Sequence, residues 1–171
     1  MAFTSGRGHE ALRRGCWSAA GIEYFLTLCT HGRNKGLTDS VVLNEILAGA
    51  NRLEVEAGWS LRALVVMPDH VHLLVVIGDA SDLAEAVRLF KGRLVPVLRK
   101  AGLQWQQAYF DHRLRTGEDC LPVFLYLFLN PYRAKLLGQG EKWVGYYCSE
   151  ADWAWFEALT NESCPLPEWL A

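Results

Sequence analysis

Two histidines one residue apart interrupt an otherwise apolar stretch, LVVMPDHVHLLVVI, at residues 64–77. In an extended strand, His70 and His72 point to the same face, with about 6–7 Å between their positions along the strand. A buried imidazole nitrogen needs a partner, which can be a neighbouring side chain or a bound ion. Two such rings can converge on one divalent metal, although imidazole alone does not select the ion and a further ligand is required. The pair therefore predicts either a metal site or two histidines satisfied by their neighbours.

A second candidate group lies in the apolar run CLPVFLYLFLNP at residues 120–131. Tyr126 and Asn130 are four residues apart, which places them on one face of a helix, one turn from each other. A tyrosine hydroxyl can act as a nucleophile, but its reference pKa of about 10 means that its proton must first be removed. Each residue also has a plainer explanation, with Tyr126 as a core residue and Asn130 as a helix end before Pro131.

Charge is distributed unevenly along the chain, although the formal net charge is only −2. Residues 86–135 contain nine Lys or Arg and three Asp or Glu, whereas residues 136–171 contain one Lys and six acidic residues. The basic segment can form a phosphate-binding surface, or it can be a solvated helix face whose charges are neutralised in three dimensions. The overall balance argues against a uniformly basic nucleic-acid binder.

Hydrophobic period and the positions of Gly and Pro indicate the elements that must hold these residues. Strands are predicted at residues 22–30, 59–67, 71–77 and 103–114. Helices are predicted from Thr38, Asp39 or Ser40 to Gly58, from near Ser81 to Gly102 with a kink at Pro96, and over residues 117–131, closed by Pro131. This order predicts an α+β protein with the ferredoxin-like split βαβ arrangement and an antiparallel sheet, followed by a third helix.

The chain length of 171 residues fits a single domain, with a core at about residues 20–137 and an acidic, Trp-rich C-terminal extension at 138–171. Most of the seven Trp are expected to be packing residues. The five Cys are scattered and lack CxxC spacing, which is typical of a reduced, cytoplasmic protein. We expect no membrane span and no signal peptide, because no apolar run has the required length or flanking pattern.

Four motifs, taken together, resemble the single-tyrosine HUH (histidine–hydrophobic–histidine) transposases, and among these the REP-associated tyrosine transposases. The motifs are MPDHVHLLVV, FKGRL, WQQAYFDHRLR and YLFLNPYRAKLL, and the resemblance runs from about Phe25 to Leu137. It implies a metal-dependent endonuclease and strand transferase for single-stranded DNA, acting at hairpin or palindromic repeats. The reaction would form a 5′-phosphotyrosine intermediate with Mg²⁺ or Mn²⁺ as cofactor.

The resemblance also implies roles for individual residues. His70 and His72 match the family's histidine ligands of the divalent metal, and Asn130 matches its third ligand. Tyr126 matches the nucleophilic tyrosine, so the third helix would be a C-terminal catalytic helix. Basic residues are expected to contact DNA phosphates: Lys91, Arg93, Arg113, Arg115 and Arg133. The resemblance further implies a cytoplasmic, nucleoid-associated protein that binds single-stranded DNA and can form a homodimer.

Two other readings of the residues remain open. A non-catalytic DNA-binding module derived from a transposase would bind hairpins without forming a tyrosyl adduct. A histidine-triad nucleotide hydrolase would need a third alternating histidine where this chain has Leu74, and it would leave Tyr126 and Asn130 unexplained. Trp105 and Tyr109 are candidates for stacking on bases, or for core packing.

Overall fold

The computed structural model describes residues 21–56, 58–78, 82–115 and 119–171 of the chain. Its strands are β1 (Ile22–Cys29), β2 (Trp59–Val66), β3 (His70–Ile77), β4 (Phe110–Arg113) and β5 (Tyr146–Cys148). Its α-helices are α2 (Ser40–Glu56), α3 (Leu83–Lys100), α4 (Leu121–Arg133) and α5 (Glu150–Phe156). Short 3-10 turns are η2 (His31–Arg33), η3 (Glu157–Leu159) and η4 (Pro167–Trp169). Within these ranges, no helix is both long enough and apolar enough to cross a bilayer.

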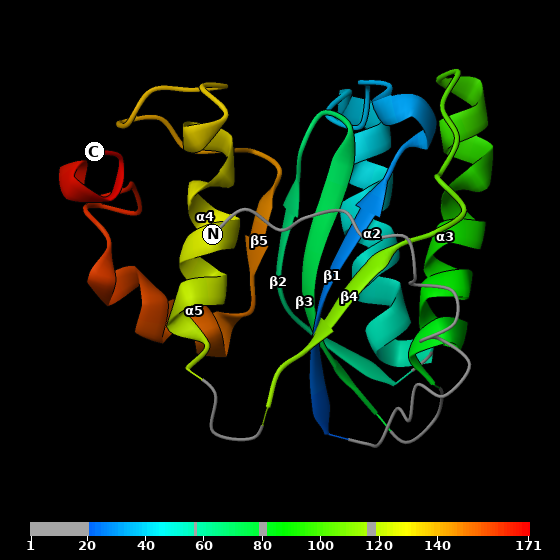
Figure 1. Ribbon diagram of the computed structural model, residues 1–171, viewed down its shortest axis with the longest axis horizontal. Helices are drawn as coiled ribbons and strands as arrows, with labels where there is room; N and C mark the ends of the chain where they lie inside the picture. Colours follow the sequence, from blue (N-terminus) through cyan, green and yellow to red (C-terminus); the bar gives the residue numbers. More distant parts are fainter. Residues whose placement is uncertain (1–20, 57, 79–81, 116–118) are drawn as a thin grey trace.

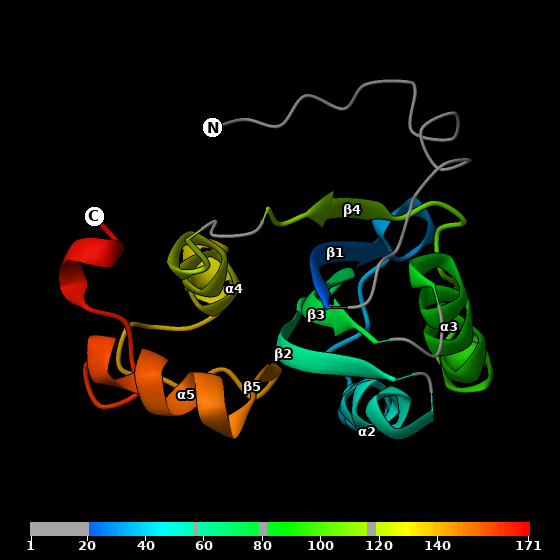
Figure 2. The same cartoon turned by 90° about the horizontal axis from the view of Figure 1, so that it is seen from below.

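The five strands form one antiparallel sheet in the order β4-β1-β3-β2-β5. The first four strands have the split βαβ order, so the predicted α+β, ferredoxin-like arrangement is confirmed. Helices α2 and α3 cover one face of the sheet, whereas α4 and α5 lie on the other side (Figures 1 and 2). The sheet therefore separates two hydrophobic cores.

The alternation of side chains along β3 assigns its residues to these two cores. Val71, Leu73 and Val75 are buried in the first core, between the sheet and α2 and α3. His72 and Leu74 point to the opposite face, where Leu74 belongs to the second core, against α4. The residue that a histidine-triad protein would need as a histidine is thus a buried leucine.

Helix α4 packs on the second core through the residues that share its buried face. Phe124, Leu127 and Phe128 are buried there, whereas Tyr126 is 42% exposed. Residues 138–171 contribute β5 to the sheet, and Phe156 and Trp153 of α5 pack into the same core. The C-terminal extension therefore covers the face of the sheet on which α4 lies.

Three sequence predictions need correction or qualification. The predicted strand at 103–114 is limited to β4 and an isolated bridge between Trp105 and Thr30. Between them, Lys91 Nζ binds the carbonyl oxygens of Gln106 (2.5 Å) and Gln107 (3.1 Å). Pro131 does not close α4, which continues to Arg133. The helix predicted from near Ser81 has Asp82 as its N-cap, whose side chain accepts a hydrogen bond from the Glu85 amide. Ser81 itself lies outside the described residues, as does Trp17, one of the Trp expected to be packing residues.

A β-bulge at Arg62 links the sheet to the helices of the second core. The β2–β3 register shifts between Leu61 and Ala63, so Arg62 is an extra residue in its strand. Its guanidinium pairs with Asp152 of α5 (2.5 Å) and Glu23 of β1 (2.9 Å), and it lies 5.2 Å from the ring centroid of Phe124. These carboxylates hold the pKa of Arg62 above its ordinary value. One side chain thus joins β1, α4 and α5.

We expect Arg62→Ala to lower the free energy of unfolding by about 2–3 kcal/mol, because it leaves two half-buried carboxylates without their cation. Urea denaturation followed by circular dichroism measures the effect. The matched control is Arg52→Ala, since Arg52 forms a single ion pair with Glu45 on the exposed surface of α2. Equal shifts of the two variants would contradict a special role for Arg62.

Candidate active site

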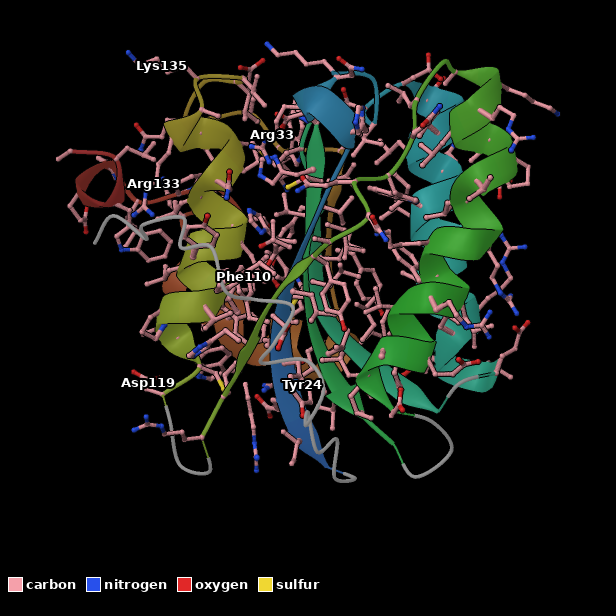
Figure 3. All side chains as sticks on the ribbon, turned by 45° about the vertical axis from the view of Figure 1, so that its right-hand side comes forward. Tyr24, Arg33, Phe110, Asp119, Arg133 and Lys135 are labelled. Atoms are coloured by element: carbon pink, nitrogen blue, oxygen red, sulfur yellow. The ribbon has the colours of Figure 1, made fainter. Side chains whose placement is uncertain are left out.

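A cavity of about 540 Å³ lies between α4 and the face of the sheet that carries His72. Its walls are mainly aromatic and histidine side chains, drawn from β1, β3, β4 and α4: Phe25, His70, His72, Phe110, His112 and Tyr126. Figure 3 shows Arg33 and Phe110 on the side of the sheet that faces α4. The predicted histidine pair and the predicted nucleophile therefore share one cavity.

Strand register brings these residues together. His72 pairs with Thr27, and His70 with Cys29, across the β1–β3 ladder. On the other edge of β1, Phe25 pairs with His112 of β4. Since paired residues of antiparallel strands point to the same face, all six side chains lie on the cavity side of the sheet.

His72 is nearly fully buried, with 4% of its surface exposed. Its Nδ1 lies 2.8 Å from Thr27 Oγ1, whereas its Nε2 is buried without a hydrogen-bond partner in the described part of the chain. Phe25 stacks on the imidazole, with the ring centroids 5.3 Å apart and the planes at 22°. The ring is thus fixed by two contacts, while one nitrogen remains available.

His70 is held by a carboxylate that also binds an arginine. Its Nδ1 lies 2.6 Å from Asp69 Oδ1, and Asp69 Oδ2 lies 2.9 Å from Arg33 Nε. The centroids of the two imidazoles are 4.6 Å apart. With Nδ1 engaged in each ring, Nε2 of both histidines is the nitrogen left for a ligand.

Burial keeps both imidazoles neutral. Desolvation lowers the pKa of His70, and the Arg33 charge lowers it further, against the opposing effect of Asp69. Desolvation lowers the pKa of His72 well below its ordinary value, with smaller contributions from His70 and Arg33. A neutral imidazole is the form that binds a metal ion, so no proton has to be displaced at neutral pH.

These features fit a divalent metal better than two structurally satisfied histidines. Metal-bound histidines commonly donate their second ring N–H to a carboxylate, carbonyl or hydroxyl that fixes the tautomer, as Asp69 and Thr27 can do here. The buried Nε2 of His72 has no hydrogen-bond partner in the described part of the chain, and its burial would be energetically costly unless it bound a ligand such as a metal ion. No group of three or more His, Cys, Asp or Glu side chains that could hold a metal ion occurs among the described residues, so further ligands must come from other residue types, water or substrate.

Tyr126 lies directly against the histidine pair. The contact is with His72 of the pair: the ring centroid of Tyr126 is 5.2 Å from that of His72 and 5.7 Å from that of Phe25, both in edge-on contacts. Its hydroxyl has no hydrogen-bond partner within the described ranges, and 42% of the residue is exposed. The phenol oxygen can therefore approach a substrate bound at the histidines.

The other predicted site residues lie in different places. Asn130 is half-buried one turn beyond Tyr126, and it is not among the described residues that line the cavity. Lys91 and Arg93 belong to α3, on the far side of the sheet, where Arg93 pairs with Glu56. Arg113 is exposed and pairs in register with Tyr24, whose side chain faces the first core. Their roles as metal ligand and as phosphate contacts remain predictions.

Two further basic residues are exposed. Arg115 follows β4, and Arg133 lies at the C-terminal end of α4 (Figure 3). Arg33, on the 3-10 turn after β1, lies at the same end of the molecule as Arg133, close to the cavity (Figure 3). Trp105 and Tyr109 pack against the first core, which agrees with core packing.

The sequence did not mark several residues of the site, among them Phe25, Thr27, Arg33 and Asp69. Asp69 directly precedes the histidine pair, which was the available signal for a partner of His70. The other three come from β1 and η2, and only the β1–β3 register brings them to the histidines. No local pattern in their own segment marks them.

Lowering the pH is expected to destabilise the metal-free protein. The unfolded histidines bind a proton near pH 6.5, whereas folded His70 and His72 do so at lower pH, so the unfolded state binds more protons below about pH 6.5. In EDTA, the urea concentration at the unfolding midpoint should decrease when the pH is lowered from about 7.5 to about 5.5. His72→Gln should reduce this dependence, whereas His31→Asn, on the exposed turn η2, should retain it. An unchanged slope in His72→Gln would refute the assignment.

Comparison with known proteins gives consistent matches. The family model of IS200-like transposases matches residues 18–115, more than half of the chain. This stretch contains both histidines of the pair and ends before α4, so Tyr126 and Asn130 lie outside it. A Haemophilus influenzae protein assigned as a REP-associated tyrosine transposase is 25% identical over 126 residues, which cover 64% of this chain and 70% of the relative.

Two solved structures share the fold. A REP-associated tyrosine transposase bound to a REP hairpin has a TM-score of 0.64 and 18% identity, and the match covers 84% of this chain and 82% of that chain. A Deinococcus radiodurans protein assigned as a transposase has a TM-score of 0.50 and 22% identity, covering 75% of this chain and 96% of the other. At these identities the likeness establishes a common architecture.

Proposed function

Because the chain belongs to the IS200-like transposase family, we propose that it cuts and rejoins single-stranded DNA through a covalent bond to Tyr126. The proposed substrate is DNA next to a hairpin or palindromic repeat. In support, the relative of similar fold was solved with a REP hairpin bound. The proposed reaction would place the protein at the nucleoid.

The observation that carries the proposal is the ring contact between Tyr126 and His72. A partly exposed phenol lies against an imidazole whose buried Nε2 has no partner in the described part of the chain. A core tyrosine beside a structural histidine would be expected to satisfy that nitrogen. The arrangement favours a nucleophile placed beside a metal site.

We propose that His70 and His72 hold Mg²⁺ or Mn²⁺ through Nε2, with Asn130 as a further ligand. When bound, the cation would polarise the scissile phosphate and stabilise charge as it develops there. The chain's own residues would orient the reacting groups, since Asp69 and Thr27 hold the histidines. The ring of Phe25 contacts both His72 and Tyr126.

In the proposed step, the Tyr126 oxygen attacks the phosphorus and loses its proton to solvent. The bond between phosphorus and the 3′ oxygen breaks, and that oxygen leaves with the electron pair and takes up a proton. The products are a 5′-phosphotyrosine and a free 3′-hydroxyl. Attack by a second 3′-hydroxyl reverses the step and rejoins DNA, so no other energy source is needed. Tyr126 and His72 of one chain are in contact, so a single subunit can carry out the attack, and a homodimer remains a prediction.

Labelled hairpin oligonucleotides with single-stranded flanks provide the test. Wild-type protein incubated with Mn²⁺ should give a labelled protein–DNA adduct on a denaturing gel, and EDTA should prevent it. The flanking sequences should form a random pool, so that the pool includes whichever target sequence the protein prefers. Hairpin binding without an adduct under any metal condition would refute strand transfer and identify a non-catalytic binding module.

A further inference from the structure

Arg33 is the one permanently charged side chain among the described residues that line the cavity. The remaining lining residues are apolar, hydroxyl-bearing or histidine side chains. The negative charge of Asp69 is shared between Arg33 and His70. A divalent cation at the histidines would leave this cavity with excess positive charge, which an anionic ligand would neutralise.

The backbone around Arg33 is held in an unfavourable conformation. Arg33 has a φ of 58°, and the preceding Gly32 has a φ of 64°, so two successive residues are left-handed. Residues other than glycine rarely adopt this region, because it is sterically unfavourable for them. Such conformations persist where surrounding contacts hold them, and they occur most often at functional sites.

The contacts that hold this turn connect it to the histidine strand. The buried Thr30 donates its amide to Asp69 O (3.0 Å), and its hydroxyl contacts both Asn34 O (2.7 Å) and Asp69 O (3.0 Å). The Arg33 amide donates to Thr30 O (3.1 Å). The position of Arg33 is therefore fixed relative to His70, although its side chain is 53% exposed.

The guanidinium retains donor capacity toward the cavity. Its Nε binds Asp69, and its Nη1 donates to Cys29 Sγ at 2.8 Å. Its Nη2 has no partner in the described part of the chain. A planar guanidinium is suited to two parallel hydrogen bonds with phosphate oxygens, whereas ammonium acts as a point charge.

From this geometry we infer that Arg33 binds a non-bridging oxygen of the scissile phosphate and stabilises the negative charge that builds there during attack by Tyr126. The inference rests on the proposed strand-transfer function. It assigns a second positive group at the phosphate, besides the cation that the histidines would hold, to Arg33 of this chain. Attack by Tyr126 on a neutral phosphate analogue should therefore depend much less on Arg33.

The test compares two hairpin oligonucleotides that differ only at the cleavage position, once wild-type nicking has mapped it. One carries the ordinary phosphate and the other a neutral methylphosphonate. Arg33→Ala should reduce the rate of adduct formation on the phosphate on the order of 10²-fold or more, and Arg33→Lys should reduce it less. On the methylphosphonate, the loss in Arg33→Ala should be less than about tenfold.

Two controls separate this role from a structural one. Arg52→Ala removes an arginine with the same 53% exposure from α2, on the other side of the sheet, and should leave both rates unchanged. Mn²⁺ affinity, measured by titration with electron paramagnetic resonance, should be unchanged or tighter in Arg33→Ala, because a nearby positive charge is removed. If Arg33 acted only by positioning Asp69 and His70, Mn²⁺ binding would weaken.

The outcomes distinguish this inference from the proposed function. An adduct with wild-type protein and equal losses in Arg33→Ala on both linkages, or no loss on either, would overturn the role of Arg33 alone. The absence of an adduct with wild-type protein would overturn strand transfer, and the Arg33 inference with it. A loss confined to the charged linkage would support both.

Discussion

Replacing Tyr126 by Phe is expected to abolish the covalent protein–DNA adduct, with adduct formation reduced on the order of 10³-fold or more. The substitution removes only the hydroxyl, which has no hydrogen-bond partner within the described ranges. The ring contacts with His72 and Phe25 can remain, so the fold and hairpin binding should be retained. Loss of the adduct would therefore reflect loss of the nucleophile.

The measurement is the rate of adduct formation on a labelled hairpin with Mn²⁺, with hairpin affinity measured in parallel by gel shift. The matched control is Tyr147→Phe, which removes a hydroxyl from a half-buried tyrosine on β5 that does not line the cavity. This control should nick at the wild-type rate. An adduct formed by Tyr126→Phe at that rate would assign the covalent bond to another residue.

The second large effect is expected from removal of either histidine of the proposed metal site. His70→Ala and His72→Ala should each lose metal-dependent nicking on the order of 10³-fold, because charge stabilisation at the phosphate is worth several kcal/mol. Mn²⁺ affinity should fall in parallel, which provides a readout independent of catalysis. His31→Ala, on the exposed turn η2, removes an imidazole away from the ladder and should change neither quantity.

His72 is buried, so His72→Ala also creates a cavity and can reduce stability. His72→Gln keeps more of the volume and is the companion variant, with circular dichroism to confirm the fold. Folded variants that nick with undiminished metal-dependent rates would refute the metal site. Both variants should still bind hairpins, because phosphate contacts elsewhere remain.

Part of this site follows directly from the sequence. The period of two along a strand places His70 and His72 on one face, and the structure confirms that face. The resemblance to REP-associated tyrosine transposases is confirmed by the family match and by the relative from Haemophilus influenzae. It also implied that Tyr126 acts together with the pair, which stays a prediction, and the structure places Tyr126, His70 and His72 in one cavity.

Other parts depend on long-range packing. The contact between Tyr126 and His72 requires α4 to lie on the histidine face of the sheet, and no spacing within residues 120–131 specifies that face. Arg33 reaches the site only because the turn after β1 is bound to the β2–β3 connection. Within the strand predicted at 103–114, Lys91 of α3 binds the carbonyl oxygens of Gln106 and Gln107, a contact between distant segments that no local pattern indicates.

The central claim is that Tyr126 forms the bond to DNA, and the most direct measurement identifies the linked residue. The trapped adduct would be digested with trypsin and nuclease and sequenced by tandem mass spectrometry. The peptide expected from cleavage after Arg115 and Arg133 contains two tyrosines, Tyr126 and Tyr132. The Tyr132 hydroxyl is an internal control, because it donates to Glu141 O at 2.6 Å and burial raises its pKa to about 12. The account predicts a nucleotide mass on Tyr126 alone, and a nucleotide on Tyr132 or on any other peptide would contradict it.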